Sequence, residues 1–179
     1  MTKNYKIVFT GPAGAGKTTA IQTLSDIPLI LTEAVATDQV RQLKPATTVA
    51  MDYGMMKLSN GDKVNLYGTP GQKRFDFMWD ILSQDAQGMV LMINATAPNP
   101  VDDLRFFCNH FRPFVESDAL VVAVTHADQV RFDVATLLMN ELNQQGAAPR
   151  VMEVDARQHK PMALLVESLI FSLNTLYSS

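Results

Sequence analysis

A glycine-rich run near the amino end of the chain constrains its fold more than any other feature. The run, Gly11–Thr18, reads GPAGAGKT and matches the spacing G-x-x-x-x-G-K-[ST]. An apolar stretch, residues 5–10, precedes it, and a segment with helical character, residues 19–24, follows it. This order of strand, glycine-rich turn and helix is typical of a loop that binds phosphate groups. The alternative is a plain glycine-rich connection before a helix, which the flanking strand and helix patterns disfavour.

The chemistry of this loop predicts a nucleoside-triphosphate site. Glycines let backbone N–H groups converge on an anion without interference from a Cβ atom. The helix that follows adds free N–H groups and the positive end of its dipole. Lys17 is expected to reach the β- and γ-phosphates and to act in catalysis, and the Thr18 hydroxyl to coordinate Mg²⁺. The residues expected to contact the nucleotide here are Gly11, Ala13, Gly14, Ala15, Gly16, Lys17, Thr18 and Thr19.

Composition places the chain among ordinary globular domains. Its 179 residues are 47% hydrophobic, enough for one domain spanning 1–179 with a sizeable core. The net charge of −3 gives no sign of a nucleic-acid partner. The single cysteine, Cys108, lies among phenylalanines and is interpreted as a buried structural thiol. No apolar stretch approaches the ~20 residues that span a bilayer. We therefore expect a cytoplasmic protein, with any recruitment to a membrane peripheral and through a partner.

Apolar strand-like runs alternate with helical patterns along the chain. They predict an α/β P-loop NTPase fold: a mostly parallel six-stranded sheet with one antiparallel strand and helices on both faces. A long polar stretch, residues 26–48, is interpreted as a functional loop. The dipeptide Asn60-Gly61 predicts a hairpin that contains the antiparallel strand. The predicted strands are residues 5–10, 49–58, 62–67, 88–94, 119–125 and 151–155, and the predicted helices after the first are 102–114, 133–145 and 161–177.

A second phosphate element follows the third predicted strand. Parallel strands place the loops at their carboxyl ends around one crevice, so the stretch 68–75 should face the glycine-rich loop. Gly71 is expected to bring a backbone N–H to the γ-phosphate, and Gln72 to orient the attacking water. Taken alone, Pro70-Gly71 is also an ordinary turn signal.

The end of the long polar loop offers a further ligand for the metal. Thr47 and Thr48 directly precede a predicted strand, and Thr48 is the better candidate because it lies next to Val49. Its hydroxyl would complete Mg²⁺ coordination, and its backbone N–H would meet the γ-phosphate. A pair of β-branched residues starting a strand is the alternative.

Two segments at the ends of later strands predict recognition of the base. Thr125, His126 and Asp128 end the clearest buried strand, and the Asp128 carboxylate can accept both the N1–H and the 2-amino hydrogens of guanine. An aspartate in this place is otherwise a turn or capping residue. After the last strand, Asp155 and Ala156 are expected to offer a backbone N–H to the guanine O6.

In order and spacing, these segments resemble the Ras-like small GTPases over nearly the whole chain. The strings TTVAMDYG (47–54), YGTPGQKRF (67–75) and FMWD (77–80) are similar to the bacterial branch, namely the gliding-motility polarity GTPases and the GTP-binding proteins of conservon operons. The resemblance implies a switch that binds GTP and Mg²⁺, hydrolyses GTP slowly to GDP, and signals through its switch loops. It also implies a regulatory partner of the roadblock type, as GTPase activator or scaffold, and an effector.

Three residues depart from the Ras-like pattern. Gly68 stands where an aspartate usually opens the second switch, so we expect weak dependence on Mg²⁺. Thr125-His126 replaces the usual Asn-Lys, which should weaken the brace between the base loop and the phosphate loop, with the imidazole stacking on the base. Ala13 replaces a glycine, and its methyl group points to the space that Gln72 needs, so slow hydrolysis is expected. Arg41 and Arg74 are candidate arginine fingers or, more simply, surface charges.

Two other interpretations remain. The aromatic segment 75–82, which holds the single tryptophan, is either helix core or a docking patch for a partner. The protein itself is either a slow, partner-dependent GTP hydrolase or a structural subunit that holds GTP with little turnover. A small-molecule kinase is disfavoured because the sequence shows no arginine-rich lid.

Overall fold

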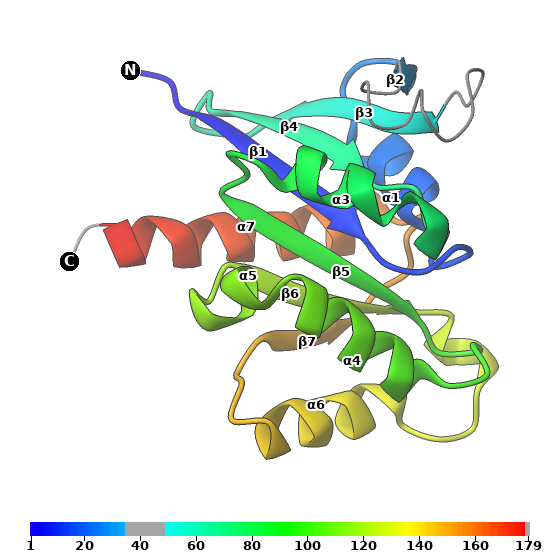
Figure 1. Cartoon of the computed structure of the whole chain (residues 1–179). Coiled ribbons are helices and arrows are strands. Elements are labelled where there is room, and N and C mark those ends of the chain that lie inside the picture. Colours follow the sequence, from blue (N-terminus) through cyan, green and yellow to red (C-terminus); the bar gives the residue numbers. More distant parts are fainter. Residues whose placement is uncertain (35–48, 178–179) are drawn as a thin grey trace.

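The computed structural model describes residues 1–34 and 49–177, and within them seven strands form one sheet (Figure 1). The strand order across the sheet is β2-β3-β4-β1-β5-β6-β7. The strands are β1 Asn4–Thr10, β2 Ile30–Ala34, β3 Val49–Lys57, β4 Lys63–Gly68, β5 Gly88–Asn94, β6 Leu120–Thr125 and β7 Arg150–Glu153. The helices are α1 Lys17–Leu24, α3 Asp76–Ser83, α4 Pro100–His110, α5 Arg112–Glu116, α6 Val134–Gln144 and α7 His159–Tyr177, with short 3₁₀ turns at Lys73–Phe75 and Ala127–Gln129.

The sheet confirms the predicted fold class and adds one strand to the predicted six. Strands β4, β1, β5, β6 and β7 run parallel, whereas β3 is antiparallel to both of its neighbours. The additional strand, β2, lies in the stretch that the sequence analysis assigned to a polar loop. It is an edge strand held by backbone pairing to β3, from Ile30 opposite Tyr53 to Ala34 opposite Val49. Pairing on one side only does not require the alternation of apolar residues by which a strand is recognised.

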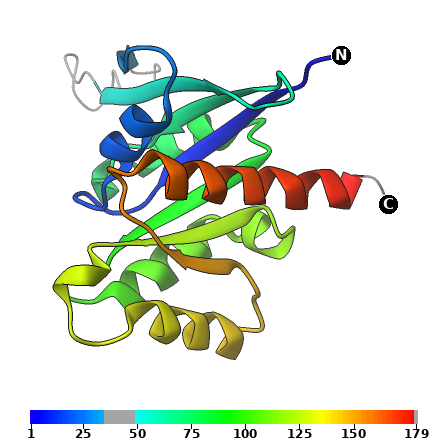
Figure 2. The same cartoon turned by 180° about the vertical axis from the view of Figure 1, so that it is seen from behind.

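Helices cover both faces of the sheet (Figures 1 and 2). On one face, α1 and α7 pack against strand residues such as Ile7 and Phe9, which are fully buried. On the other face, α3, α4 and α6 pack around Val8, Trp79 and Leu104, also fully buried. The central strands are therefore apolar on both sides, as a parallel sheet in this architecture requires.

Helix boundaries follow local chemistry. The Asn99 side chain caps α4 by accepting a hydrogen bond from the Asp102 N–H, and Asp133 caps α6 through the Thr136 N–H. The single helix predicted over 102–114 is instead two helices, because Pro113 has no N–H to continue the ladder and its ring crowds the preceding turn. The break lies at Phe111, which is both the C-cap residue of α4 and the N-cap residue of α5.

The carboxyl ends of the parallel strands meet along one edge of the sheet. Here β1 ends at Thr10, β4 at Gly68, β5 at Asn94 and β6 at Thr125. These are the strand ends that lead into the predicted phosphate and base segments. At the opposite end of β4, Gly61 has φ +90 in the β3–β4 hairpin that Asn60-Gly61 predicted.

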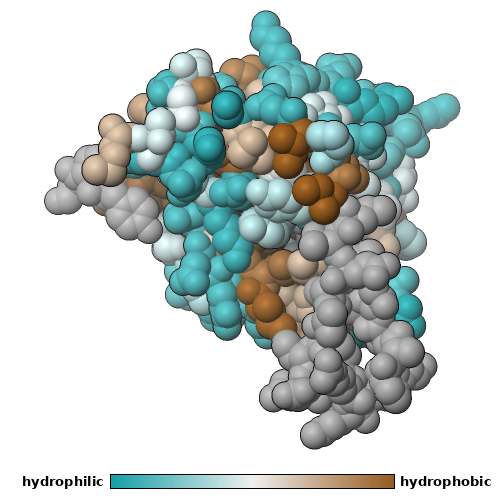
Figure 3. All heavy atoms as spheres, turned by 90° about the horizontal axis from the view of Figure 1, so that it is seen from above, coloured by the Kyte–Doolittle hydropathy of each residue, from teal (hydrophilic) through white to brown (hydrophobic). Residues whose placement is uncertain are grey.

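The surface seen from above is largely hydrophilic in its described part (Figure 3). Hydrophobic side chains on this face gather in small groups and not in one broad patch. Among the described residues, no helix is both long and apolar enough to cross a membrane.

Candidate functional site

Three glycines in the loop between β1 and α1 have left-handed backbone: Gly11, Gly14 and Gly16. Gly11 has φ +138, and a Cβ added there would lie 2.2 Å from the carbonyl oxygen of Met92 in β5. Gly16 has φ +97 and immediately precedes the first residue of α1. Left-handed backbone of this kind is accessible to glycine at little cost. The loop is therefore folded tightly against the end of β5, with the start of α1 at its carboxyl end.

The side chain of Lys17, the first residue of α1, reaches back into this loop. Its ammonium group donates hydrogen bonds to the carbonyl oxygens of Gly11 at 2.7 Å and Pro12 at 2.8 Å, and only 8% of the residue is exposed. Burial lowers the pKa of Lys17 to about 8, against the opposing effect of the Asp52 carboxylate. A phosphate group is the natural partner of such a partly desolvated cation.

A cavity of about 480 Å³ opens beside Lys17. In it the Thr18 hydroxyl donates a 2.5 Å hydrogen bond to Oδ2 of Asp52. Sequence analysis missed Asp52, because it lies in the middle of β3 and reaches the cavity only through the pairing of β3 with β4. The lining residues come from the glycine-rich loop, β3 and the end of β4: Ala13, Gly14, Gly16, Lys17, Thr18, Thr19, Asp52, Gly68, Thr69, Pro70 and Gly71.

The loop after β4 lies directly on the glycine-rich loop, as predicted for a second phosphate element. A Cβ added at Gly71 would be 2.5 Å from the Ala13 nitrogen and 3.0 Å from Nζ of Lys17. Gln72, the predicted catalytic residue, is exposed and is not among the residues that line the cavity. Arg74 is also exposed, with its guanidinium 4.7 Å from the ring centre of Phe75, a surface position.

Two contacts fix this loop to the body of the domain. The Thr69 hydroxyl donates to the Thr10 hydroxyl at 3.0 Å, and both residues are buried. The indole N–H of Trp79 donates to the Pro70 carbonyl at 2.7 Å. Trp79 is fully buried and packs against Phe107 at 4.8 Å between ring centres. The tryptophan thus belongs to the helix core, and the docking-patch interpretation is wrong for this residue.

A second cavity, of about 230 Å³, adjoins the first at Gly16 and Thr19. It contains every residue that the sequence analysis assigned to base recognition. Asp128 is exposed on its rim, whereas His126 is half-buried, with φ +58 and its Nδ1 3.1 Å from the Thr125 hydroxyl oxygen. The residues that line it are Gly16, Thr19, Thr125, His126, Asp128, Gln129, Val154, Asp155, Ala156 and Arg157.

The brace between the base loop and the phosphate loop is present, although the sequence analysis expected it to be weak. The buried Thr125 hydroxyl donates to the Ala15 carbonyl at 2.8 Å. A second brace comes from β5, where Nδ2 of Asn94 donates to the Gly14 carbonyl at 3.1 Å. A threonine hydroxyl is short but reaches the loop because β6 ends directly beside it.

The carboxylate of Asp155 is already occupied. Arg157 donates to it from Nε at 2.9 Å and from Nη2 at 2.8 Å. These hydrogen bonds lower the pKa of Asp155 to about 2. Any contact of this segment with a base would therefore use its backbone, as the sequence analysis expected of Asp155 and Ala156.

Some predicted site residues lie outside the described residues. They are Thr48, the second predicted metal ligand, together with Thr47 and Arg41. Within residues 1–34 and 49–177, no group of three or more histidine, cysteine or acidic side chains is arranged to hold a metal ion. The cavity beside Lys17 is lined by oxygen donors, among them the Thr18 hydroxyl and the Asp52 carboxylate.

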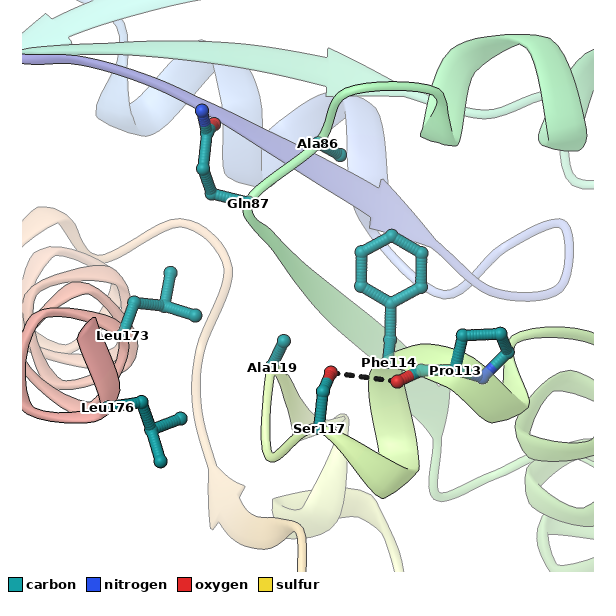
Figure 4. Close-up of a pocket in the computed structure, with 8 residues that line it drawn as sticks. All are labelled: Ala86, Gln87, Pro113, Phe114, Ser117, Ala119, Leu173 and Leu176. Atoms are coloured by element: carbon teal, nitrogen blue, oxygen red, sulfur yellow. Dashed lines mark hydrogen bonds between the residues drawn. The ribbon is translucent and has the colours of Figure 1, made fainter. Parts of the chain in front are cut away.

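A separate cavity of about 340 Å³ lies at the other end of the sheet (Figure 4). Leu173 and Leu176 of α7 face Phe114 of α5 across it, and the Ser117 hydroxyl donates to the Pro113 carbonyl at 2.7 Å. Its described lining carries no charged side chain. The Ser117 hydroxyl is already hydrogen-bonded, and the described lining offers no charged group to a ligand. This cavity therefore differs from the two cavities at the carboxyl ends of the strands, which are lined by charged side chains.

Solved structures share this fold. The G domain of the T. maritima FeoB iron transporter superposes with a TM-score of 0.68, covering 93% of this chain and 97% of that one at 18% identity. The architecture is thus that of a small-GTPase-like P-loop domain, as the sequence predicted.

The family follows from the sequence comparison. Residues 26–175 match the family described as conserved hypothetical ATP binding protein, and the chain belongs to that family. The match begins after the glycine-rich loop, so it adds evidence independent of that motif. The family is described by ATP binding, whereas the sequence analysis predicted GTP.

Individual relatives are distant. An uncharacterized protein of Methanocaldococcus jannaschii is 28% identical over 92 residues, which are 51% of this chain and 51% of that protein. This chain therefore spans about half the length of that relative. The Ras-related protein RabC of Dictyostelium discoideum is 18% identical over 93% of this chain and 82% of its own length. An intraflagellar transport protein 22 homolog of Danio rerio is 26% identical over 66% of this chain and 64% of its own length.

Proposed function

We propose that this protein is a GTP-binding molecular switch that hydrolyses GTP slowly to GDP. The observation that carries the proposal is the position of Gly71, whose backbone lies against Ala13 and Lys17 at the phosphate cavity. A γ-phosphate bound beside Lys17 would meet this loop, whereas a diphosphate would not. The loop is thus placed to differ between the two nucleotide states.

The proposed path from nucleotide to surface runs through Pro70. Its carbonyl accepts the indole N–H of Trp79, so displacement of the loop would act on α3. Trp79 in turn packs against Phe106, Phe107 and His110 of α4. A partner that contacts α3 or α4 could then read the nucleotide state. We propose a regulatory protein, of the roadblock type by the stated resemblance to the bacterial branch, and an effector, both acting in the cytoplasm.

Guanine is the proposed base. The carboxylate of Asp128 at the second cavity accepts hydrogen bonds, and guanine offers the N1–H and 2-amino donors as a pair. Adenine lacks that pair, but the family description favours ATP, so ATP binding is the second candidate. His126 lies on the same cavity and is proposed to stack on the base.

The fold family implies Mg²⁺ with the nucleotide, and the oxygen donors in the phosphate cavity fit this ion. The Thr18 hydroxyl and the Asp52 carboxylate are hard ligands of the type that Mg²⁺ prefers. When bound, the ion would neutralise charge on the phosphates. The chain's own part is positioning: Lys17 holds the phosphates, the glycine-rich loop offers N–H groups, and Gln72 would orient the attacking water.

Slow hydrolysis follows from two positions. Gln72 is exposed and outside the lining of the cavity, so it must move inward to orient a water molecule. The Ala13 backbone lies against Gly71, so the methyl group of Ala13 adds bulk close to the loop that carries Gln72. If Gln72 does not reach the cavity at all, the same arrangement gives a subunit that holds GTP structurally and hydrolyses little of it.

The test is to identify the nucleotide and follow its fate. We expect GDP or GTP to copurify with the protein, as resolved by ion-exchange chromatography, and single-turnover hydrolysis to be slow until a partner is added. Emission from Trp79, the single tryptophan, should differ between the GDP-bound and GTP-analogue-bound states. Copurified ATP or ADP would favour the second candidate, and an identical emission in both states would contradict the switch.

Asp128→Asn tests the base assignment directly. We expect GTP affinity to fall by at least ~10-fold, because a charge-assisted hydrogen bond is lost. Affinity for xanthosine triphosphate should rise, since an amide N–H can pair with its 2-carbonyl. Asp118→Asn, at the exposed turn before β6, is the matched control. Unchanged GTP affinity in Asp128→Asn would contradict the assignment of guanine.

A further inference from the structure

The sequence analysis found no carboxylate at position 68 to serve the metal ion, yet the structure places one in the same cavity. Asp52 lies directly opposite Gly68 in the antiparallel pairing of β3 with β4. Its Oδ2 atom is 3.2 Å from the point that a Cβ at Gly68 would occupy, and its Cβ is 3.1 Å from that point. The space that a side chain at position 68 would enter is therefore filled by Asp52.

Gly68 and Asp52 are complementary in size, since the missing side chain of one leaves room for the carboxylate of the other. A side chain at Gly68 would also approach the Ile21 side chain in α1 to 3.0 Å, so Ile21 and Asp52 would have to shift to admit it. The absence of a side chain on β4 is what makes room for a carboxylate from β3. Of the residues described as lining this cavity, Asp52 alone carries a carboxylate.

The hydrogen bond from Thr18 orients a metal ligand. A hydroxyl group has one proton and two lone pairs. Because the Thr18 proton is donated to Asp52 at 2.5 Å, both lone pairs of its oxygen are available to a cation. Metal ligands are commonly held in this manner by a carboxylate that accepts their remaining proton.

The other candidate for this role is already bonded within the protein. Thr69 follows Gly68, and the sequence analysis considered its hydroxyl for the outer coordination of the ion. In the structure that hydroxyl donates to Thr10 and is buried beneath the loop. Its proton is therefore used within the protein, and a neutral hydroxyl supplies no negative charge to balance that of the ion.

We propose that Asp52 is the positioning carboxylate for the Mg²⁺ ion of the nucleotide, holding the Thr18 hydroxyl and supplying the negative charge that position 68 lacks. This inference rests on the proposed function, since the ion arrives with a nucleotide. It reverses the expectation of weak Mg²⁺ dependence, which assumed that the site had no carboxylate. Asp52 is not expected to contact the base or the phosphates.

The experiment measures release of a fluorescent guanine nucleotide as free Mg²⁺ is varied, with the adenine analogue measured in parallel. In the wild type, Mg²⁺ should slow release strongly. In Asp52→Asn, the Mg²⁺ concentration for half the effect should rise by ~10- to 100-fold, the range for loss of a residue that orients a metal ligand. Release in excess chelator should stay within about threefold of the wild type, equal to ~0.65 kcal/mol, because Asp52 is not proposed to contact the nucleotide.

Two further variants sharpen the result. Asp52→Ser, a smaller side chain, should shift the Mg²⁺ response in the same direction, which guards against a folding defect peculiar to asparagine. Asp76→Asn removes an exposed carboxylate in the first turn of α3 and should leave the response unchanged. Affinity for Mn²⁺ in the nucleotide complex, read by electron paramagnetic resonance, should fall in parallel in both Asp52 variants.

The outcomes separate the inference from the proposed function. An unchanged Mg²⁺ response in Asp52→Asn overturns the inference, as does faster release that is equal with and without Mg²⁺, since that would be a structural effect. Failure of the wild type to bind either nucleotide even with Mg²⁺ present overturns the proposed function. Binding of the adenine analogue alone overturns the base assignment but leaves Asp52 testable with that nucleotide.

Discussion

The Thr125 hydroxyl donates a hydrogen bond to the Ala15 carbonyl, joining the end of β6 to the middle of the glycine-rich loop at 2.8 Å. Both residues are buried, so neither group has water as a substitute partner. The bond thereby connects the base cavity to the phosphate cavity.

Replacing Thr125 with valine should reveal the strength of this connection. The substitution keeps the branched shape but leaves the Ala15 carbonyl without its donor, which costs ~1–3 kcal/mol. We expect the free energy of unfolding in urea to fall by that amount and nucleotide affinity to fall as well. Thr2→Val, an exposed change ahead of β1, is the control. Equal stability of the two variants would contradict the role of the brace.

Gly11→Ala should destabilise the domain severely. The added Cβ would lie 2.2 Å from the Met92 carbonyl oxygen, at a φ of +138. Backbone strain costs ~1–3 kcal/mol, and overpacking adds ~1–3 kcal/mol. Gly146→Ala isolates the first effect, because its φ is +70 and nothing lies within 4 Å of the added atom. In chemical denaturation, Gly11→Ala should lose much more free energy of unfolding than Gly146→Ala. Similar losses in the two variants would argue against the close approach of Gly11 to β5.

Gly71→Ala should separate triphosphate binding from diphosphate binding. The new methyl group would meet the Ala13 backbone at 2.5 Å and push the loop away from the phosphate cavity. Since only a γ-phosphate would contact this loop, we expect GTP affinity to fall by ~10-fold, equal to ~1.4 kcal/mol, with little change for GDP. Titration with fluorescent analogues of both nucleotides measures this. Equal losses for GTP and GDP would mean that the loop does not sense the third phosphate.

Nucleotide affinity should depend on pH through Lys17. Burial lowers the pKa of this ammonium to about 8 in the free protein, and a bound phosphate raises it again. Above pH 8 the free protein has lost the proton that the complex keeps, so binding must take up a proton. Affinity should therefore be level below about pH 7 and fall by up to ~10-fold per unit above pH 8.

Calorimetry in buffers with different enthalpies of ionisation detects this proton. Lys17→Arg is the control, because a guanidinium stays charged and takes up no proton over this range. Binding by the wild type at pH 9 without proton uptake would show that the Lys17 pKa is not lowered.

Cys108 should be nearly inert in the folded protein. It is buried, and burial raises the pKa of its thiol to about 11 from an ordinary value of 9.0. The thiolate is the reactive form, so a shift of this size lowers its fraction at pH 8 by ~100-fold. Reaction with a colorimetric disulfide reagent should be slow in buffer and fast in urea. Comparable rates in both would mean that the thiol is exposed.

Much of the fold was predictable because its signals are local. The spacing GPAGAGKT, the apolar runs of the central strands and the Asn60-Gly61 turn each depend on a few neighbouring residues. These gave the position of the glycine-rich loop, the strands β5 and β6 and the β3–β4 hairpin. The end of α4 was also local in origin, since Pro113 predicted a helix end nearby, but the short helix α5 after Phe111 was not predicted.

The remaining features depend on pairing between distant segments. Strand β2 forms because its backbone pairs with β3. The sequence of β2 alone did not predict this pairing. Trp79 could not be assigned to the core or the surface from its segment, and contacts with α4 decided it. The contact of Asp52 with Thr18 likewise depends on the register between β3 and β4.

The sequence by itself determined that this chain has a phosphate loop, an α/β sheet and candidate base-reading residues at the ends of its strands. Those properties follow from residue type and short spacing, which set backbone freedom and hydrophobic pattern. Only the tertiary structure decided that Thr125 braces Ala15, that Gln72 lies outside the cavity and that Asp52 fills the place beside Gly68. Contacts of this kind depend on strand register and loop packing, in which residues far apart in the chain come within hydrogen-bonding distance.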